Sequence, residues 1–181
     1  MDQEVQSLRE IGKEIDVSEQ VIIEALWAIV YAQHCGSTLA PVFTSSRYSW
    51  GTQPSNSMGF FNTKIPLNVN VDTEESFRGL CLRINEYHFK TRHYGTYNGS
   101  LLKSQMRHGE CFSVNLEFSP IRQVEFSSLF PLTIVFDQQD RMIYFKYDPS
   151  IDGRFIQTIA DHLLAAMTEM CDPCKTCLLY T

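Results

Sequence analysis

Hydrophobic positions recur every three or four residues near the amino terminus. Val5, Leu8, Ile11 and Ile15 share one face, which predicts an amphipathic helix over roughly residues 2 to 15. The next segment, up to Gly36, is apolar on almost every side, so it predicts a helix that is buried on most of its surface. Asp16 and Glu19 are spaced as in a capping box, which predicts that this second helix begins at Val17.

Shorter apolar runs predict five strands. Ala40 to Ser45 is a short buried run, and Ile65 to Val71 alternates apolar and polar positions as a half-buried strand does. Phe112, Val114, Leu116 and Phe118 would form one face of a third strand. The last two predicted strands, Leu132 to Phe136 and Met142 to Tyr147, flank Gln138-Gln139-Asp140 and indicate a hairpin.

Helical spacing returns twice more. Asp72 and Glu75 resemble a second capping box, before a helix that runs to about Arg92, and Leu101 to Met106 is a short helical stretch. A final helix is expected to point these residues inward: Phe155, Ile156, Ile159, Leu163, Ala166, Met167 and Met170. Helices and strands alternate early and a hairpin follows late. This order predicts an α/β sandwich with one mixed sheet packed against helices.

Composition narrows the class of partner. The formal net charge is −6 and the pI is about 5.3, which argues against nucleic acid and against an anionic membrane surface. The uncharged stretch from residue 25 to 46 is interrupted by Gln33, His34, Gly36 and Pro41, so it does not predict a membrane span. Met1-Asp2-Gln3-Glu4 does not resemble the start of a secretory signal, so a cytoplasmic location is expected.

The six cysteines divide into two groups. Cys35, Cys81 and Cys111 lie in apolar segments and are expected to be reduced packing residues. The other three, Cys171, Cys174 and Cys177, are spaced as metal ligands are, but the tail offers no fourth ligand. They are therefore a weak metal candidate, and residues 171–181 are expected to be a disordered tail after a domain over residues 1–170.

Four segments together resemble one known family. They are the buried helix VSEQVIIEALWAIVYAQHCG, the strand and loop APVFTSSRYSW, the entry segment and strand MGFFNTKIPLNV, and the closing PLTIVFDQQDRMIYFKYDPSIDGRFIQTIADHLLAAM. The third is the most specific, because Gly59, Phe61, Asn62 and Thr63 follow the order of a Gly-x-Phe-x-Asn-Thr motif, with one residue fewer between the Phe and the Asn. The chain resembles the C-terminal lobe of the condensation domains of nonribosomal peptide synthetases.

The resemblance implies a fold and a place for each matching residue. In this family two lobes, each like a chloramphenicol acetyltransferase subunit, enclose a tunnel that admits two carrier-bound substrates. Matching positions would line the tunnel: Arg47, Trp50, Gly59, Phe61, Asn62, Thr63, His93, and either Asn115 or Glu117 on the third strand. Glycine allows a close backbone approach in such a wall, and the Asn and Thr side chains can fix a loop by local hydrogen bonds.

The departures from the family are equally informative. The catalytic motif His-His-x-x-x-Asp-Gly is absent, and all five histidines are isolated along the chain. In the family this motif belongs to the N-terminal lobe. We therefore expect no catalytic residue in this chain and no condensation by the chain alone. Of a further family motif only His93 is matched, and the connection between Phe118 and Leu132 that crosses to the other lobe is short.

The resemblance also implies the partners. An N-terminal lobe with the catalytic motif would complete the domain, and peptidyl carrier domains would deliver amino acids and acyl groups as phosphopantetheine thioesters. No bound cofactor, metal or nucleotide is implied. Two other functions stay open. The chain could be a non-catalytic interaction lobe or homo-oligomer that covers an exposed apolar face, or an oligomeric acyltransferase with His93 or His108 as the base of an inter-subunit site.

Overall fold

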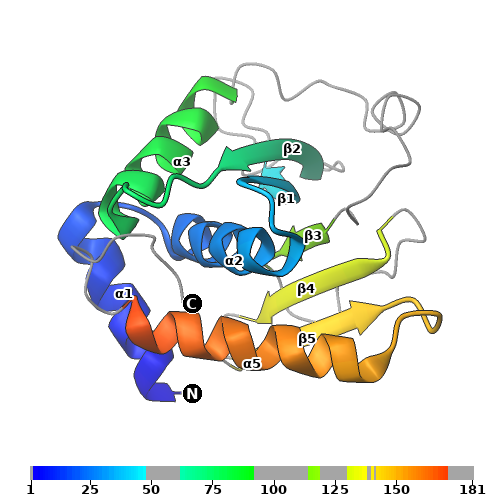
Figure 1. Ribbon diagram of the computed structural model, residues 1–181. Coiled ribbons are helices and arrows are strands. Elements are labelled where there is room, and N and C mark those ends of the chain that lie inside the picture. The colour runs from blue at the N-terminus through cyan, green and yellow to red at the C-terminus, as the bar shows by residue number, and fades with distance from the viewer. Residues whose placement is uncertain are drawn as a thin grey trace.

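The computed structural model describes residues 2–47, 62–91, 114–118, 130–137, 140 and 142–170 (Figure 1). The helices in this part are α1 (Asp2–Ile15), α2 (Glu19–Cys35), α3 (Phe77–Thr91) and α5 (Gly153–Glu169). The strands are β1 (Leu39–Arg47), β2 (Asn62–Asn70), β3 (Val114–Glu117), β4 (Leu132–Asp137) and β5 (Met142–Tyr147). All five predicted strands are confirmed, and so is the first helix.

The strands form one mixed sheet in the order β2-β1-β3-β4-β5. β1, β3 and β4 are parallel to one another, and β2 and β5 pair antiparallel with β1 and β4 at the two edges. The carboxyl ends of β1, β3 and β4 therefore lie at the same edge of the sheet as the amino end of β2. We call this the carboxyl edge.

Helix α2 lies at the centre of the molecule, in front of the sheet in Figure 1. It packs against α1, α3, α5, β1 and β2, and every residue from Val21 to Tyr31 is buried. A helix that is apolar on all sides needs such a position, as its sequence predicted. It ends at Gly36, where the backbone takes the left-handed conformation (φ 59°) that glycine tolerates best.

The two faces of the sheet differ in chemistry. Side chains alternate between faces along a strand, and residues paired across strands share a face. The face toward α2 is part of the hydrophobic core and includes Val42, Leu67, Val114, Leu116 and Ile134. The opposite face carries a row that crosses four strands, Phe43, Asn115, Thr133 and Lys146, as successive register partners. We call it the polar face.

Three local predictions need correction. Helix α2 begins at Glu19 with Ser18 as its N-cap, whereas Asp16 has a φ of 57° and ends the preceding turn. Helix α3 begins at Phe77, and the amide of Gly79 donates to the Ser76 hydroxyl, so Asp72 and Glu75 do not cap it.

Phe155 is 37% exposed and does not join the inward residues of the last helix. The other six residues predicted to face inward on that helix are buried, so the periodicity was otherwise right. Cys81 is buried as expected, and Cys35 is half-buried. None of the helices in the described ranges is long and apolar enough to cross a membrane.

Candidate functional site

The predicted tunnel residues Arg47, Asn62 and Thr63 meet at the carboxyl edge. Arg47 is the last residue of β1 and pairs with Asn62, the first residue of β2, and Thr63 pairs with Ser46. Backbone pairing thus brings together two motifs that are separated by fourteen residues in the chain. In sheets with parallel strands, ligands commonly bind beyond the carboxyl ends of those strands.

The two candidates on β3 occupy the polar face at the same edge. Asn115 is buried, with 2% of its surface exposed, and Glu117 is the last residue of the strand. The Asn115 side-chain amide donates to Glu117 Oε1 over 3.1 Å. The prediction that both lie on the polar side of their strand is confirmed, and the hydrogen bond means that a change in one residue alters the other.

Strand register adds residues that were not predicted from the sequence. Thr133 is buried beside Asn115 in the four-strand row, and Lys146 follows it on β5. Asp137 ends β4 at the carboxyl edge and is also buried, but its Oδ1 accepts the amide hydrogen of Asp140, which is an ordinary turn interaction. Only strand pairing could have revealed the row, because its members are distant in sequence.

This arrangement can orient a polar group by hydrogen bonds. Amide, hydroxyl, carboxylate and ammonium groups share the polar face, and no histidine lies among them in the part of the face that the structure describes. Such groups can bind and position a substrate amide or thioester by hydrogen bonds. The carboxylates of Glu117 and Asp137 belong to a class that can accept a proton, and Asp137 already accepts a hydrogen bond from the Asp140 amide.

Several predictions fall on residues outside the described ranges. The site residues among them are Trp50, Gly59, Phe61, His93, His108 and the three tail cysteines Cys171, Cys174 and Cys177. The packing cysteine Cys111 and the short helical stretch from Leu101 to Met106 also lie outside those ranges. For Arg47, Asn62 and Thr63 the backbone alone is described. Within the described residues no three histidine, cysteine or acidic side chains gather as metal ligands. The roles of all these residues stay predictions.

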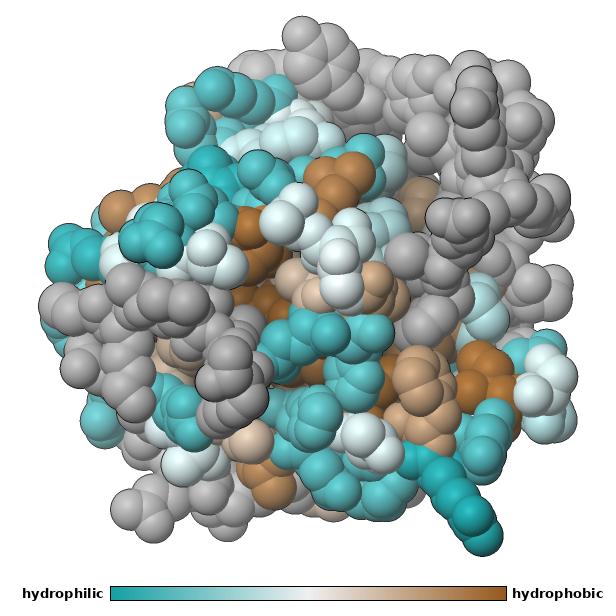
Figure 2. All heavy atoms as spheres, viewed as in Figure 1, coloured by the Kyte–Doolittle hydropathy of each residue, from teal (hydrophilic) through white to brown (hydrophobic). Residues whose placement is uncertain are grey.

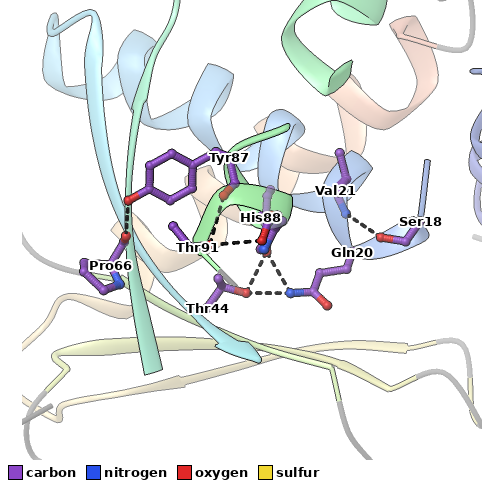
Figure 3. A network of polar contacts seen from close by, with 9 residues as sticks. Ser18, Gln20, Val21, Thr44, Pro66, Tyr87, His88 and Thr91 are labelled. Atoms are coloured by element: carbon purple, nitrogen blue, oxygen red, sulfur yellow. Dashed lines mark hydrogen bonds and ion pairs between the residues drawn. The ribbon is translucent and has the colours of Figure 1, made fainter. Parts of the chain in front are cut away.

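A second polar group lies on the opposite side of β1, inside the core. Glu24 of α2 is completely buried, and it contacts Gln20 on the same helix, Thr44 on β1 and His88 on α3. Figure 3 shows Gln20, Thr44 and His88 converging on one point. We call these three residues and Glu24 the Glu24 cluster.

Hydrogen bonds satisfy both carboxylate oxygens of Glu24. Thr44 Oγ1 donates to Oε1 over 2.6 Å, Gln20 Nε2 lies 3.0 Å from the same oxygen, and His88 Nε2 lies 2.5 Å from Oε2. Gln20 Nε2 also lies 2.9 Å from Thr44 Oγ1. A hydrogen therefore lies between the Glu24 carboxyl group and the His88 ring nitrogen.

This cluster was not predicted from the sequence. A detectable signal was present, because Gln20 and Glu24 lie one turn apart in a helix that is otherwise almost entirely apolar. Glutamate is almost never fully buried without partners, so its place in such a helix implied a partner elsewhere. The identity of that partner, 64 residues later in the chain, was not available from spacing alone.

Side chains of helix α3 also bind the backbone of β2, the strand at one edge of the sheet. The Tyr87 hydroxyl donates to the carbonyl of Pro66 over 3.0 Å, and Arg83 donates to the carbonyl of Asn70 over 2.5 Å. Burial raises the pKa of Tyr87, so its hydroxyl keeps its proton for this bond. Between helix and strand lies an open groove of about 290 Å³, lined by residues that include Leu67, Asn68 and Ile84.

Comparisons with known proteins find likeness in structure alone. No family model and no curated protein sequence matches the chain. The first condensation domain of the CDA synthetase aligns with a TM-score of 0.79 and 15% identity, over 99% of this chain and 45% of that one. A condensation domain from the Monacolin K polyketide synthase gives 0.77 and 8%, over 97% and 46%.

A larger enzyme shows the same relationship. A four-domain nonribosomal peptide synthetase, crystallised with AMP and glycine, aligns with a TM-score of 0.80 and 9% identity, over 98% of this chain and 17% of that one. The chain therefore spans less than half the length of the condensation domains that it matches. It has the α/β, chloramphenicol acetyltransferase-like fold of a single condensation-domain lobe, consistent with the C-terminal lobe that its sequence resembles.

Proposed function

We propose that this chain acts as the C-terminal lobe of a condensation-type domain in nonribosomal peptide synthesis. In the complete domain an acyl or peptidyl group leaves one phosphopantetheine thioester, and its carbonyl carbon forms an amide bond with the amine of a second carrier-bound substrate. The thiol of the first carrier is released. This chain would supply one wall of the tunnel, and the partner lobe would supply the His-His-x-x-x-Asp-Gly motif.

The single observation that carries the proposal is the coverage of the structural match. Almost the whole chain aligns with a condensation domain, and it accounts for 45% of that domain. A fold shared by unrelated enzymes does not identify a reaction by itself, and the local resemblance of the entry motif supports the same assignment. Asn62 and Thr63 of that motif lie where the pairing of β1 and β2 begins, beside Arg47.

Each wall residue would position rather than react. The Asn115 amide, fixed by Glu117, is suited to hold one orientation on the polar face. Accurate positioning of an amine near a thioester can lower the barrier by several kcal/mol, and a general base supplies roughly 10²–10⁴-fold more. The described residues of this lobe can contribute to the first effect, and the partner lobe would contribute the second.

The proposal makes a direct prediction about activity. The purified chain, mixed with two loaded carrier domains, should give no amide product above the uncatalysed rate. Addition of an N-terminal lobe that carries the His-His motif should give product, measured by mass spectrometry of the carrier-bound species. Product from this chain alone, or no product after a complex of the two lobes has been demonstrated, would contradict the proposal.

Variants at the predicted tunnel residues sharpen the test. Asn62→Ala and Asn115→Ala should lower the rate of the paired lobes by at least tenfold, whereas Asn85→Ala, at an exposed position on α3, should leave it unchanged. Circular dichroism of each variant checks that the fold is retained. Equal rates for all three variants would remove the tunnel assignment of these residues.

The remaining details belong to the same proposal. Carrier domains with phosphopantetheine would be the partners in the cell, and the cytoplasm would be the location. No metal or other cofactor would be bound to this chain. Residues 1–170 would form the lobe, and residues 171–181 would follow it as a tail that takes no part in the reaction.

A further inference from the structure

The Glu24 cluster joins three elements at one point. Gln20 and Glu24 come from α2, Thr44 from β1 and His88 from α3 (Figure 3). Each of these elements already packs on another through apolar side chains, so the cluster is not needed merely to bring them together. Apolar packing is non-directional, whereas hydrogen bonds fix distance and angle.

The position of Thr44 connects the cluster to the candidate site. Thr44 pairs with Ile65 on one side and with Leu116 on the other, so it is fixed within the central part of the sheet. Arg47 follows three residues later, a distance of about 10 Å along a strand. His88 lies one turn before α3 ends at Thr91. The cluster therefore holds β1 and α3 close to where each of them ends.

The cost of this cluster argues that it does more than stabilise. Replacement of both partners of a buried polar pair by apolar residues of similar shape can be nearly neutral or stabilising, because removing polar groups from water costs free energy. Glu24 has no exposed surface, and the side chain of His88 is 14% exposed. Methionine and leucine could fill these positions without the desolvation cost. A retained polar cluster can instead fix one relative arrangement of the packed elements.

We propose that the Glu24 cluster is a positioning device for the carboxyl edge. It sets where α3 lies against β1 and so fixes the end of the β1–β2 ladder, at the pairs formed by Arg47 with Asn62 and Ser46 with Thr63. Its meaning for catalysis rests on the proposed function, in which that edge is part of the tunnel wall. Glu24, Thr44 and His88 are thus positioning residues and touch no substrate.

The test uses amide hydrogen exchange of the full chain, read at both ends of one ladder. Single loss of a partner, as in Glu24→Ala, leaves buried polar groups unpaired and is expected to unfold the chain. The informative variant replaces the pair, Glu24→Met with His88→Leu. At the carboxyl edge, the exchange rates of the amides of residues 45–47 and 62–64 should rise at least tenfold. At the opposite end of the ladder, the exchange rates of Leu39, Ala40, Val69 and Asn70 should stay unchanged.

Two controls separate positioning from stability. Ile22→Val removes one methyl group from the same helix, at a fully buried position, and should alter both ends of the ladder equally. Glu24→Gln keeps an oxygen that can accept a hydrogen bond from the Thr44 hydroxyl. It should therefore keep most of the protection against exchange that the double variant loses at the carboxyl edge. Equal changes at both ends in the double variant, or no change at either end, would overturn the proposal.

The outcome is independent of the activity experiment. The exchange pattern reports how readily the hydrogen bonds at each strand end open in this chain, whether or not the paired lobes form an amide. If the end-specific pattern appears and paired lobes give no product, the proposed function fails and the mechanical role of the cluster stands. If the lobes give product and the exchange is uniform, the function stands and the positioning proposal fails.

Discussion

Two stacked histidines make the stability of this protein sensitive to acid. His34 of α2 and His162 of α5 lie with ring centroids 4.7 Å apart, and Phe155 approaches His34 edge-on. Burial lowers the pKa of His34 below its ordinary value of 6.5, and the charge of His162 lowers it further. Within the described residues His34 Nε2 is buried without a hydrogen-bond partner, so a proton there would have no acceptor.

The sign of the effect follows from proton linkage. The unfolded chain binds a proton at position 34 more readily than the folded chain does. The free energy of unfolding is therefore highest above about pH 6.5 and falls as the pH drops through the lower pKa of the folded state. Urea unfolding at pH 7.5 and pH 5.5 measures how much the free energy of unfolding falls between the two pH values. This decrease should be smaller in His34→Gln than in the unchanged protein.

A partner variant tests the assigned cause. His162→Gln removes the neighbouring charge but leaves His34 buried, so it should reduce the acid loss by a smaller amount than His34→Gln. If His34→Gln shows the same loss between the two pH values as the unchanged protein, the acid sensitivity has another origin.

The contact between the end of α1 and the start of α2 depends on a glycine. A Cβ at Gly12 would lie 2.9 Å from the carbonyl oxygen of Val17 and 3.2 Å from Ile22 Cδ1. The carbonyl of Gly12 itself accepts the amide hydrogen of Val17 over 2.9 Å. The backbone therefore needs the smallest residue at this turn, because neither neighbour can move without disturbing a buried contact.

Alanine at this position should destabilise the fold. Gly12→Ala is expected to lower the free energy of unfolding by about 1–3 kcal/mol, the usual range for overpacking a core. Gly153→Ala is the matched control, because its Cβ would meet only the Tyr147 hydroxyl at an ordinary 3.5 Å. It should stabilise the first turn of α5 by about 0.5 kcal/mol. Chemical denaturation of both variants measures the difference, and a stable Gly12→Ala would refute the close contact.

Much of the element pattern could be predicted because it is local. The first helix and all five strands follow from spacing of 3.6 or 2 residues, and α2 from its apolar surface. The cap of α2 was predicted two residues early, because Asp16 and Ser18 are both good capping residues and only backbone conformation distinguishes them. The exposure of Phe155 depends on which other elements pack against that position of the helix, and the spacing of apolar residues gives no information on this.

The candidate site was predictable only in part. Alternation placed Asn115 and Glu117 on one side of β3, and the structure confirms their contact. The Glu24 cluster and the row through Thr133 and Lys146 unite residues from separate elements, so they depend on helix packing and strand order. A family resemblance identifies residues that match a motif. It gives no information on polar groups outside the motif.

At the scale of the whole molecule, the lone lobe exposes apolar side chains. Brown patches lie between teal ones on the face shown in Figure 2. The exposed apolar residues of the described chain include Leu82 at 43% and Phe89 at 66% on α3, and Leu164 at 45% on α5. Apolar side chains left in water favour association with another protein surface or with a second copy.

We expect this exposed surface to be visible in solution. Light scattering during size-exclusion chromatography should show concentration-dependent self-association of the lone chain, and an added N-terminal lobe should replace it with a pair of the two lobes. Phe89→Ser should weaken the self-association without lowering the free energy of unfolding, because this ring is mostly exposed. A chain that stays monomeric and ignores the second lobe would count against the account.

The most direct test of the central claim examines the protein as its source makes it. We would purify it with its natural partners and determine intact mass, terminal sequences and the identity of every co-purifying chain. The account predicts that the sequence His-His-x-x-x-Asp-Gly lies either in the same polypeptide or in a tightly bound partner. A native protein that consists of this chain alone, with no partner that carries the motif, would contradict a role as a condensation-domain lobe.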